Sequence, residues 1–453
     1  MDSQDPEKTI ASDEAPNVDK DRATDGLDGV IDPQNWPRKR KITMISLVTL
    51  LTFNDSFASS IFAPVVSSIM DEFQTSSSVV SSLLISIHVI GLVAGPLVLA
   101  PPSEVYGRWP IIQLSNALFV VSAVLSAASV NVPMMLIARI LLGLAGSVPM
   151  TISGSVITDL MPVQTRGGVV SCWSGVLVLV GPIIGGYMGM LVGWRWTFWL
   201  VTIMTGCLTI PCFFLMQETY LPVLVRRQQA RNSPRWSQVL LPAATRPIRL
   251  AIQSPVIMLV SMYNSVGYVY LYFMITTFPQ LFSHRYGFNP GEVGLAYIGQ
   301  GVGSLLAQLS VGYFSNWCCS TRGQTPPLSV GCIVLGLGMI WYGWSAQAQA
   351  HWIMPIVASG VVGIGCMYLL VPVGLYIIDA FPAYAASGLA VNVVLRSVLG
   401  AFIPLSGPSL YGHWGYGWGN SVLGFIALAL APTTVWIRRH GEWLRTHASL
   451  QLD

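Results

Sequence analysis

The chain has 453 residues; 53% of them are hydrophobic, 9% are charged, and the formal net charge is +3. Soluble domains carry about 25% charged residues, so this composition excludes a water-soluble enzyme or binding domain and indicates a protein with many membrane spans. The weak positive charge does not indicate a nucleic-acid partner, because the basic residues stand beside the ends of apolar segments, where anionic lipid attracts them.

Residues 1–41 are mostly polar, contain proline and lack an apolar run, so we expect a disordered cytoplasmic arm and no cleavable signal peptide. After residue 41, windows of about 20 apolar residues recur, the length that crosses a hydrocarbon core of roughly 30 Å. Twelve spans are predicted, at 42–66, 79–100, 109–129, 133–157, 169–190, 196–216, 254–278, 292–314, 327–346, 352–376, 386–410 and 418–437.

The longest break between predicted spans divides them six and six. We therefore expect an all-α membrane protein with twelve transmembrane helices, in which two six-helix bundles at 42–216 and 254–437 are joined by a cytoplasmic loop at 217–253. A cytoplasmic tail is expected at 438–453.

Lysine and arginine residues flank the predicted spans mainly on one side. Arg38 to Lys41 and Arg108 stand on that side, whereas Arg195 and Arg285 stand on the other. Basic flanks remain in the cytosol. Both termini are therefore predicted to be cytoplasmic, in a multi-pass protein of the plasma membrane.

The seven cysteines lie in or near spans or on the side predicted to be cytoplasmic. They have no Cys-x-x-Cys spacing and no histidine partner, so they are interpreted as small packing residues. Neither a disulfide, a metal site nor another cofactor is expected.

Four ionisable residues fall inside predicted spans, where charge is costly and usually functional: Asp55, His88, Arg139 and Arg396. Asp55 lies in the middle of span 1, where burial favours binding and release of a proton. Its alternative role is structural, as a partner of Arg139 or of the neighbouring Asn54 and Ser59.

The other three residues also have two interpretations. His88 could relay protons or serve as a hydrogen-bonded packing residue. Arg139 could take part in coupling or extend its side chain to the interface. Arg396 could face an anionic substrate or pair with Asp379 near the inner end of its bundle.

The loop after span 2 contains Glu104, Gly107 and Arg108 between prolines. An acid and a base at a cytoplasmic helix junction can form an ion pair that latches two bundles in one state. Short charged loops can also serve topology alone. The flanking glycine and prolines favour a fixed geometry.

Span 5 contains Gly181, Pro182, Gly185 and Gly186 within one apolar run. In a membrane helix, glycine and proline allow neighbouring backbones to approach closely and the helix to bend. This segment is therefore predicted to be a closely packed moving part.

Aromatic and amide residues in spans 7 and 10 are candidates for the lining of a central cavity. Asn264, Tyr268 and Tyr272 recur at helical spacing within the tyrosine-rich run 263–272 of span 7, and Tyr368 lies in span 10. They offer stacking surfaces and polar groups for a cargo. Interhelical packing or an interfacial aromatic belt is the alternative.

Several motifs occur in one order along most of the chain. They are Asn35-Trp36-Pro37, Ser59 to Pro64, Gly95-Pro96, Ser103-Glu104-x-Tyr106-Gly107-Arg108, Arg139 with Gly143 and Gly146, Gly181-Pro182-x-x-Gly185-Gly186, Glu218-Thr219-Tyr220, and Ala390-x-Asn392 through Arg396. Together they resemble the major facilitator superfamily, and more closely its twelve-span drug:proton antiporters of filamentous fungi.

This resemblance implies two pseudo-symmetric bundles, each made of inverted three-span repeats, that rock around a central cavity to give alternating access. It also implies that Arg139 is tied to proton coupling, that the loop after span 2 is a conformational latch, and that residues 181–186 form the antiporter motif.

The resulting prediction is a secondary active exporter, not an enzyme, that moves amphipathic small molecules out of the cell in exchange for protons. We expect a lipid-embedded monomer. Export of polyamines or other organic cations is an alternative, but such cargo would need several intramembrane acids and Asp55 is the clear one. Nutrient uptake stays open because fold does not fix direction. A receptor or membrane enzyme is disfavoured, because the sequence has neither metal-ligand spacing nor a nucleophile elbow.

Overall fold

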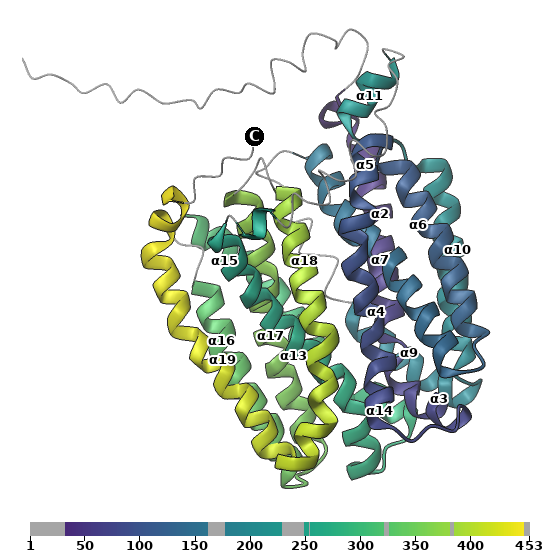
Figure 1. The fold of residues 1–453 in the computed structure, drawn as a ribbon, viewed down its shortest axis with the longest axis vertical. Coiled ribbons are helices and arrows are strands. Elements are labelled where there is room, and N and C mark those ends of the chain that lie inside the picture. The colour runs from purple at the N-terminus through teal and green to yellow at the C-terminus, as the bar shows by residue number, and fades with distance from the viewer. Residues whose placement is uncertain are drawn as a thin grey trace, which may run out of the picture.

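The computed structural model describes residues 32–161, 177–228, 249–252, 254–320, 326–380 and 385–447. Within these ranges the regular structure is entirely helical, and its twelve long helices form two bundles (Figure 1). The first bundle contains α2 (Arg38–Ser60), α4 (Ser78–Val98), α6 (Arg108–Ala127), α7 (Val132–Leu160), α9 (Leu177–Leu191) and α10 (Arg195–Leu215). The second contains α13 (Pro255–Tyr286), α15 (Ile298–Ser320), α16 (Pro326–Gln347), α17 (Ile353–Ala380), α18 (Ala385–Phe402) and α19 (Gly407–His447).

Short helices lie at the two ends of the bundles (Figure 1). One end carries η1 (Pro33–Asn35), α5 (Ala100–Tyr106) and α11 (Leu221–Gln228); the other carries η2 (Ala63–Val65), α3 (Val66–Glu72), α14 (Pro290–Ala296) and η5 (Ile403–Ser406). The first end also holds the basic starts of α2 and α6. We call it the basic end and the opposite one the far end.

Nine stretches of the described residues are long and apolar enough to cross a membrane. One of them, Gly388–Thr434, runs through most of α18 and α19, and the helical path within α19 breaks at Gly415, where φ is 70°. The apolar part of α9 is shorter, at Val180–Leu191. If Gly388–Thr434 is counted as two helices and α9 and α15 are added, the described chain has the twelve expected helices. The exact limits of the bundles and of the loop at 217–253 stay predictions.

The two bundles repeat one pattern of helix contacts. In the first, α4 packs on α7 and α6 packs on α10; in the second, α15 packs on α17 and α16 packs on α19. Glycine permits the closest of these approaches. A Cβ atom on Gly143 of α7 would lie 2.0 Å from the carbonyl oxygen of His88, and one on Gly303 of α15 would lie 1.9 Å from that of Gly360. Close backbone contact through small residues is how membrane helices associate.

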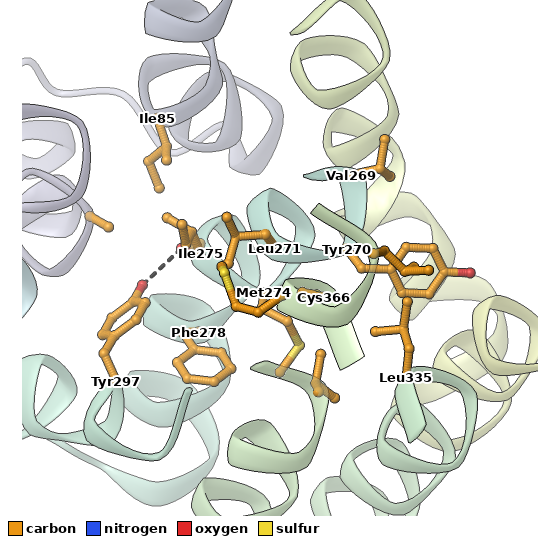
Figure 2. Close-up of a cluster of buried hydrophobic side chains, with 14 of the residues drawn as sticks. Ile85, Val269, Tyr270, Leu271, Met274, Ile275, Phe278, Tyr297, Leu335 and Cys366 are labelled. Atoms are coloured by element: carbon orange, nitrogen blue, oxygen red, sulfur yellow. Dashed lines mark hydrogen bonds between the residues drawn. The ribbon is translucent and has the colours of Figure 1, made fainter. Parts of the chain in front are cut away.

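The hydrophobic cores of the two ends differ. One large buried cluster runs along the second bundle, from Leu250 and Ile257 to the far end, where it also includes Phe62 and Ile85 of the first bundle. Figure 2 shows the part of it around Ile85, Ile275 and Tyr297. At the basic end, the first bundle has a separate cluster that runs from Trp36 and Met44 to Cys212 and Met216. No described residue of the second bundle belongs to that cluster. The bundles are therefore joined by hydrophobic packing at the far end.

Candidate functional site

A buried acid and a buried histidine meet in the centre of the first bundle. Asp55 lies on α2 and is 4% exposed, and His88 lies on α4 and is fully buried. The Nε2 atom of His88 is 3.2 Å from Oδ1 of Asp55. The sequence did not predict this pair; Asn54 and Ser59 instead bind Thr205 and Tyr272.

Arg139 of α7 lies close to this pair and is fully buried. Its Nη1 and Nη2 atoms donate to the carbonyl oxygens of Ala58 and Ile85, at 3.5 and 3.3 Å. The guanidinium also lies 4.2 Å from the centre of the Phe62 ring, in cation–π geometry. An arginine that extends to the membrane interface is therefore the wrong interpretation. Arg139 also forms no ion pair with Asp55.

Glycines on α7 create the space for the Asp55–His88 pair. A Cβ atom on Gly146 would lie 1.7 Å from Oδ1 of Asp55, so no larger residue fits there unless the carboxylate moves. Gly143 lets α4 approach until the backbone of His88 touches α7. The spacing of these glycines thus places two ionisable groups of different helices side by side.

The residues of the predicted latch lie at the basic end, where Arg108 contacts a different acid from the one expected. Arg108 begins α6, and its Nε atom lies 3.4 Å from Oδ2 of Asp159, near the end of α7. Arg108 also donates to Ser103 at 3.4 Å and covers the ring of Tyr220 at 4.8 Å. The side chain of Glu104 lies outside the described residues. The described partner of Arg108 is therefore Asp159, which the sequence analysis did not select.

Glu218 binds the first turn of α6. Its carboxylate accepts the backbone N–H groups of Arg108 at 2.9 Å and Trp109 at 3.2 Å. An acid at a helix N-terminus satisfies free N–H groups and interacts favourably with the helix dipole. Gly107 is required here twice, because its φ is 107° and because a Cβ atom would lie 1.9 Å from Oε2 of Glu218.

Asp159 lies beyond the apolar stretch of α7, which ends at Ile157. Burial raises the pKa of the Asp159 carboxyl to about 6, although Arg108 and Thr219 stabilise its charged form. Asp159 is therefore more easily protonated than an exposed aspartate.

The glycine–proline segment of α9 contacts both bundles. Cβ atoms on Gly181 and Gly185 would lie 2.2 Å from Oγ of Ser60 and 2.0 Å from the carbonyl oxygen of Ile61. Residues four apart share a helix face, so this face is packed on α2. The other face meets α14 of the second bundle.

The contact between α9 and α14 is made largely of backbone. A Cβ atom on Gly186 would lie 2.4 Å from the carbonyl oxygen of Pro290, and one on Gly294 would lie 2.4 Å from that of Pro182. The predicted close packing of this segment is thus present, and it forms part of the far-end contact between bundles.

The candidate residues of α13 occupy one face at a spacing of four. Asn264 donates to Oδ1 of Asn392 on α18 at 2.7 Å. The rings of Tyr268 and Tyr272 lie 4.8 Å apart. The hydroxyl of Tyr272 is 2.9 Å from Oγ of Ser59 and thereby links the two bundles.

Other tyrosines of the same run face elsewhere. The hydroxyl of Tyr263 interacts with Thr433, and that of Tyr270 donates to the carbonyl oxygen of Leu423, both on α19. Figure 2 shows Tyr270 extending away from Ile85 and Tyr297. Tyr263 and Tyr270 are therefore packing residues of the second bundle.

Two further candidates of the second bundle lie apart from each other. The hydroxyl of Tyr368 is 2.9 Å from Oγ of Ser310 on α15. Arg396 of α18 lies over the Tyr268 ring, with 4.8 Å from Cζ to the ring centre, and its Nη2 is 3.4 Å from Sδ of Met150 on α7. The structure thus joins Arg396 to Tyr268 and the seam between bundles, but not to Tyr368.

The described residues contain no cluster of three or more His, Cys, Asp or Glu side chains suited to a metal ion. The described cysteines, at 207, 212, 332 and 366, are free. The functional candidates are therefore the ionisable groups and aromatic faces given above.

Comparisons with known proteins agree with this architecture. The family model of the Major Facilitator Superfamily matches residues 48–404. MFS transporter cpaT of Aspergillus oryzae is 38% identical, with 94% of this chain and 93% of the relative covered. Efflux pump radE of Floropilus chiversii is 35% identical, with 94% and 85% covered.

A solved structure shares the fold at low sequence identity. The partially occluded inward open conformation of the xylose transporter XylE from E. coli gives a TM-score of 0.68 at 18% identity, with 88% of this chain and 97% of that chain covered. The relatives are transporters, so the function is transport and not enzymatic catalysis. The chain belongs to the major facilitator superfamily.

Proposed function

We propose that the protein is a secondary active exporter that moves amphipathic small molecules out of the cytosol in exchange for protons. The observation that carries this proposal is the buried Asp55–His88 pair, whose atoms are 3.2 Å apart beside the buried Arg139. A proton that binds such a pair changes the charge of a site shielded from water, where the electrostatic energy of each conformation depends strongly on that charge. Asp55, His88 and Arg139 are thus the proposed coupling residues.

The distribution of contacts supports alternating access. The bundles share a hydrophobic core at the far end, whereas the basic-end core described above contains only the first bundle. We assign the basic end to the cytosol, because basic flanks remain there. Bundles that pack together at the far end would then correspond to an inward-facing state. Arg108, Gly107 and Glu104 belong to the proposed inner latch, together with Asp159 and Glu218.

The export direction is supported by the relative named an efflux pump and by the glycine–proline segment of α9. We place the protein in the plasma membrane as a monomer with both termini in the cytosol. Asn264, Tyr268, Tyr272, Tyr368 and Arg396 are proposed to face or support the cargo. Export of a polycation is less well supported, because Asp55 lies in the middle of α2 and already faces His88, whereas Asp71 and Glu72 lie at the far end of the same apolar stretch.

The test measures transport and proton flux in the same proteoliposomes. Purified protein is reconstituted with a pH indicator inside, and fluorescent amphiphiles that do not titrate between pH 5 and 8 are added: one neutral, one sulfonate and one quaternary ammonium. We expect a pH gradient to drive accumulation of at least one probe, and that probe to drive protons the opposite way.

Asp55→Asn removes the titratable carboxylate at nearly constant volume. This variant should lose gradient-driven accumulation and probe-driven proton flux, by about 100-fold or more, while probe exchange without a gradient continues. The matched control is Asp71→Asn, which changes an exposed carboxylate on α3. Accumulation that persists in Asp55→Asn would assign the coupling elsewhere, and movement that ignores the gradient would indicate a facilitator.

A further inference from the structure

Arg396 is a cation with few partners. Its guanidinium has five N–H donors, yet the polar contact of Arg396 within the described chain is the sulfur of Met150, a weak acceptor. Its Nε atom is buried without an acceptor, and none of the ion pairs formed by described residues includes it. The side chain is only partly buried.

The depth of Arg396 makes this isolation costly. It stands 11 residues after Ala385, the first residue of α18, which corresponds to about 16 Å along the helix. That distance is about half of a hydrocarbon core of roughly 30 Å. Asp379, the partner considered from sequence, stands in the last turn of α17, and its side chain lies outside the part of the chain that the structure describes.

Arg139 shows how this fold holds an arginine inside one bundle. It is fully buried and donates through Nη1 and Nη2 to two backbone carbonyl oxygens, although its Nε atom, like that of Arg396, has no acceptor. Arg396 has neither feature and lies where α7 of one bundle meets α18 of the other. A charged group that is left accessible at such a seam suits a ligand that enters between the bundles.

An aromatic surface adjoins the guanidinium. The Tyr268 ring lies under Arg396 and packs against α18 at Gly400, where a Cβ atom would come within 2.7 Å of the ring. Tyr268 and Tyr272 also share a hydrophobic cluster with Val89 of α4. A cation thus stands at the edge of an apolar, aromatic patch contributed by both bundles.

We infer that Arg396 binds an acidic group of the cargo, and that the preferred cargo is an amphipathic organic anion with an aromatic or apolar body. This inference rests on the transport function proposed above and names its substrate class. A carboxylate would accept the free N–H donors of Arg396, while the body of the molecule packs on Tyr268 and Tyr272.

Binding is measured with a matched set of dansyl probes and purified protein in nanodiscs of zwitterionic lipid. Dansylglycine is an anion, dansylglycinamide is its neutral counterpart, and monodansylcadaverine is a cation. Energy transfer from the protein's tryptophans reports binding, and empty nanodiscs supply the blank. The wild type should bind the acid at least about tenfold more tightly than the amide, and the cation least tightly.

Arg396→Gln should remove the preference for the acid and leave binding of the amide within about twofold, whereas Arg396→Lys, which keeps the charge but not the planar group, should keep part of the preference. Arg195→Gln, which removes an arginine from the far-end surface, is the control and should change nothing. The inference is overturned if the wild type shows no preference for the acid. A preference that survives Arg396→Gln, or an equal loss of acid and amide binding in that variant, overturns it as well.

These measurements use no pH gradient. Failure of proton coupling in the proteoliposomes would therefore leave an acid preference in the nanodiscs intact, and absence of that preference would leave a proton-coupled exporter of other cargo. The two proposals fail separately.

Discussion

The centres of the two bundles hold their polar groups in different ways. In the first, Asp55 and His88 are buried 3.2 Å apart, and the buried Arg139 donates to backbone carbonyl oxygens. In the second, the amides of Asn264 and Asn392 pair with each other, and Arg396 remains without an acidic partner among the described residues. The helix contacts of the bundles are nevertheless alike. The comparison teaches that one repeated scaffold can bury a group of neighbouring charges in one half and hold a partly exposed cation without an acidic partner in the other.

The strongest test of this difference between the bundles is an arginine-to-lysine substitution in each of them. Arg139→Lys removes the planar group that reaches two carbonyl oxygens, and charge-assisted hydrogen bonds are worth about 1.5–3 kcal/mol each. Transport should fall by roughly 10- to 100-fold, and the midpoint of thermal unfolding should fall with it. Arg396→Lys keeps the charge and loses one weak sulfur contact and the stacking of the planar group on Tyr268, so transport should fall less, by about two- to fivefold.

Equal losses in these two variants would break the comparison. They would mean that Arg396 is as firmly built into its bundle as Arg139. Transport rates per amount of folded protein, with the unfolding midpoint measured on the same preparation, separate a transport effect from loss of protein.

The shared packing scheme predicts a second effect that should be similar in both halves. Gly143→Ala places a methyl group 2.0 Å from a carbonyl oxygen of α4, and Gly303→Ala places one 1.9 Å from a carbonyl oxygen of α17. Each should destabilise the protein by about 1–3 kcal/mol through overpacking. The control is Gly154→Ala, also on α7, because a Cβ atom there meets no atom within 4 Å. A loss confined to one bundle would show that the resemblance of the halves does not extend to their energetics.

The smallest effect is expected at the tyrosine that links the halves. Tyr272→Phe removes a hydrogen bond to Ser59 across the bundles, worth about 0.5–1.5 kcal/mol, and should change the transport rate by roughly two- to tenfold. Tyr263→Phe removes a hydroxyl contact with Thr433 inside the second bundle and should leave the rate unchanged. Ser59→Ala combined with Tyr272→Phe completes a double-mutant cycle; additive effects would show that the bond is not coupled to transport.

Much of this architecture follows from the composition of the chain. Apolar length predicts the twelve helices, because a span must satisfy its backbone within itself. The same pattern cannot say which neighbour a helix face meets. Tyr270 and Tyr272 are two residues apart, yet one contacts α19 and the other contacts Ser59 of the first bundle.

The partners of the ionisable residues could not be predicted from the sequence either. Asp55 meets His88 because Gly143 and Gly146 set how closely α2, α4 and α7 approach, and that distance depends on packing and not on periodicity. Asp159 was missed because an acid at the end of a span resembles an ordinary topological residue. The one available signal was that it stands at the same end of the bundle as Arg108.

The backbone contact between α9 and α14 has a consequence for how such a transporter evolves. Gly186 and Gly294 meet main-chain atoms of Pro290 and Pro182, and main-chain atoms are the same whatever the surrounding sequence. The groups proposed to select the cargo stand on α13 and α18. Substitutions there can retune selectivity while the closure of the far end is inherited unaltered, so a new cargo is reached in few steps. The same separation marks α13 and α18 as the helices to diversify when engineering an exporter for a chosen product.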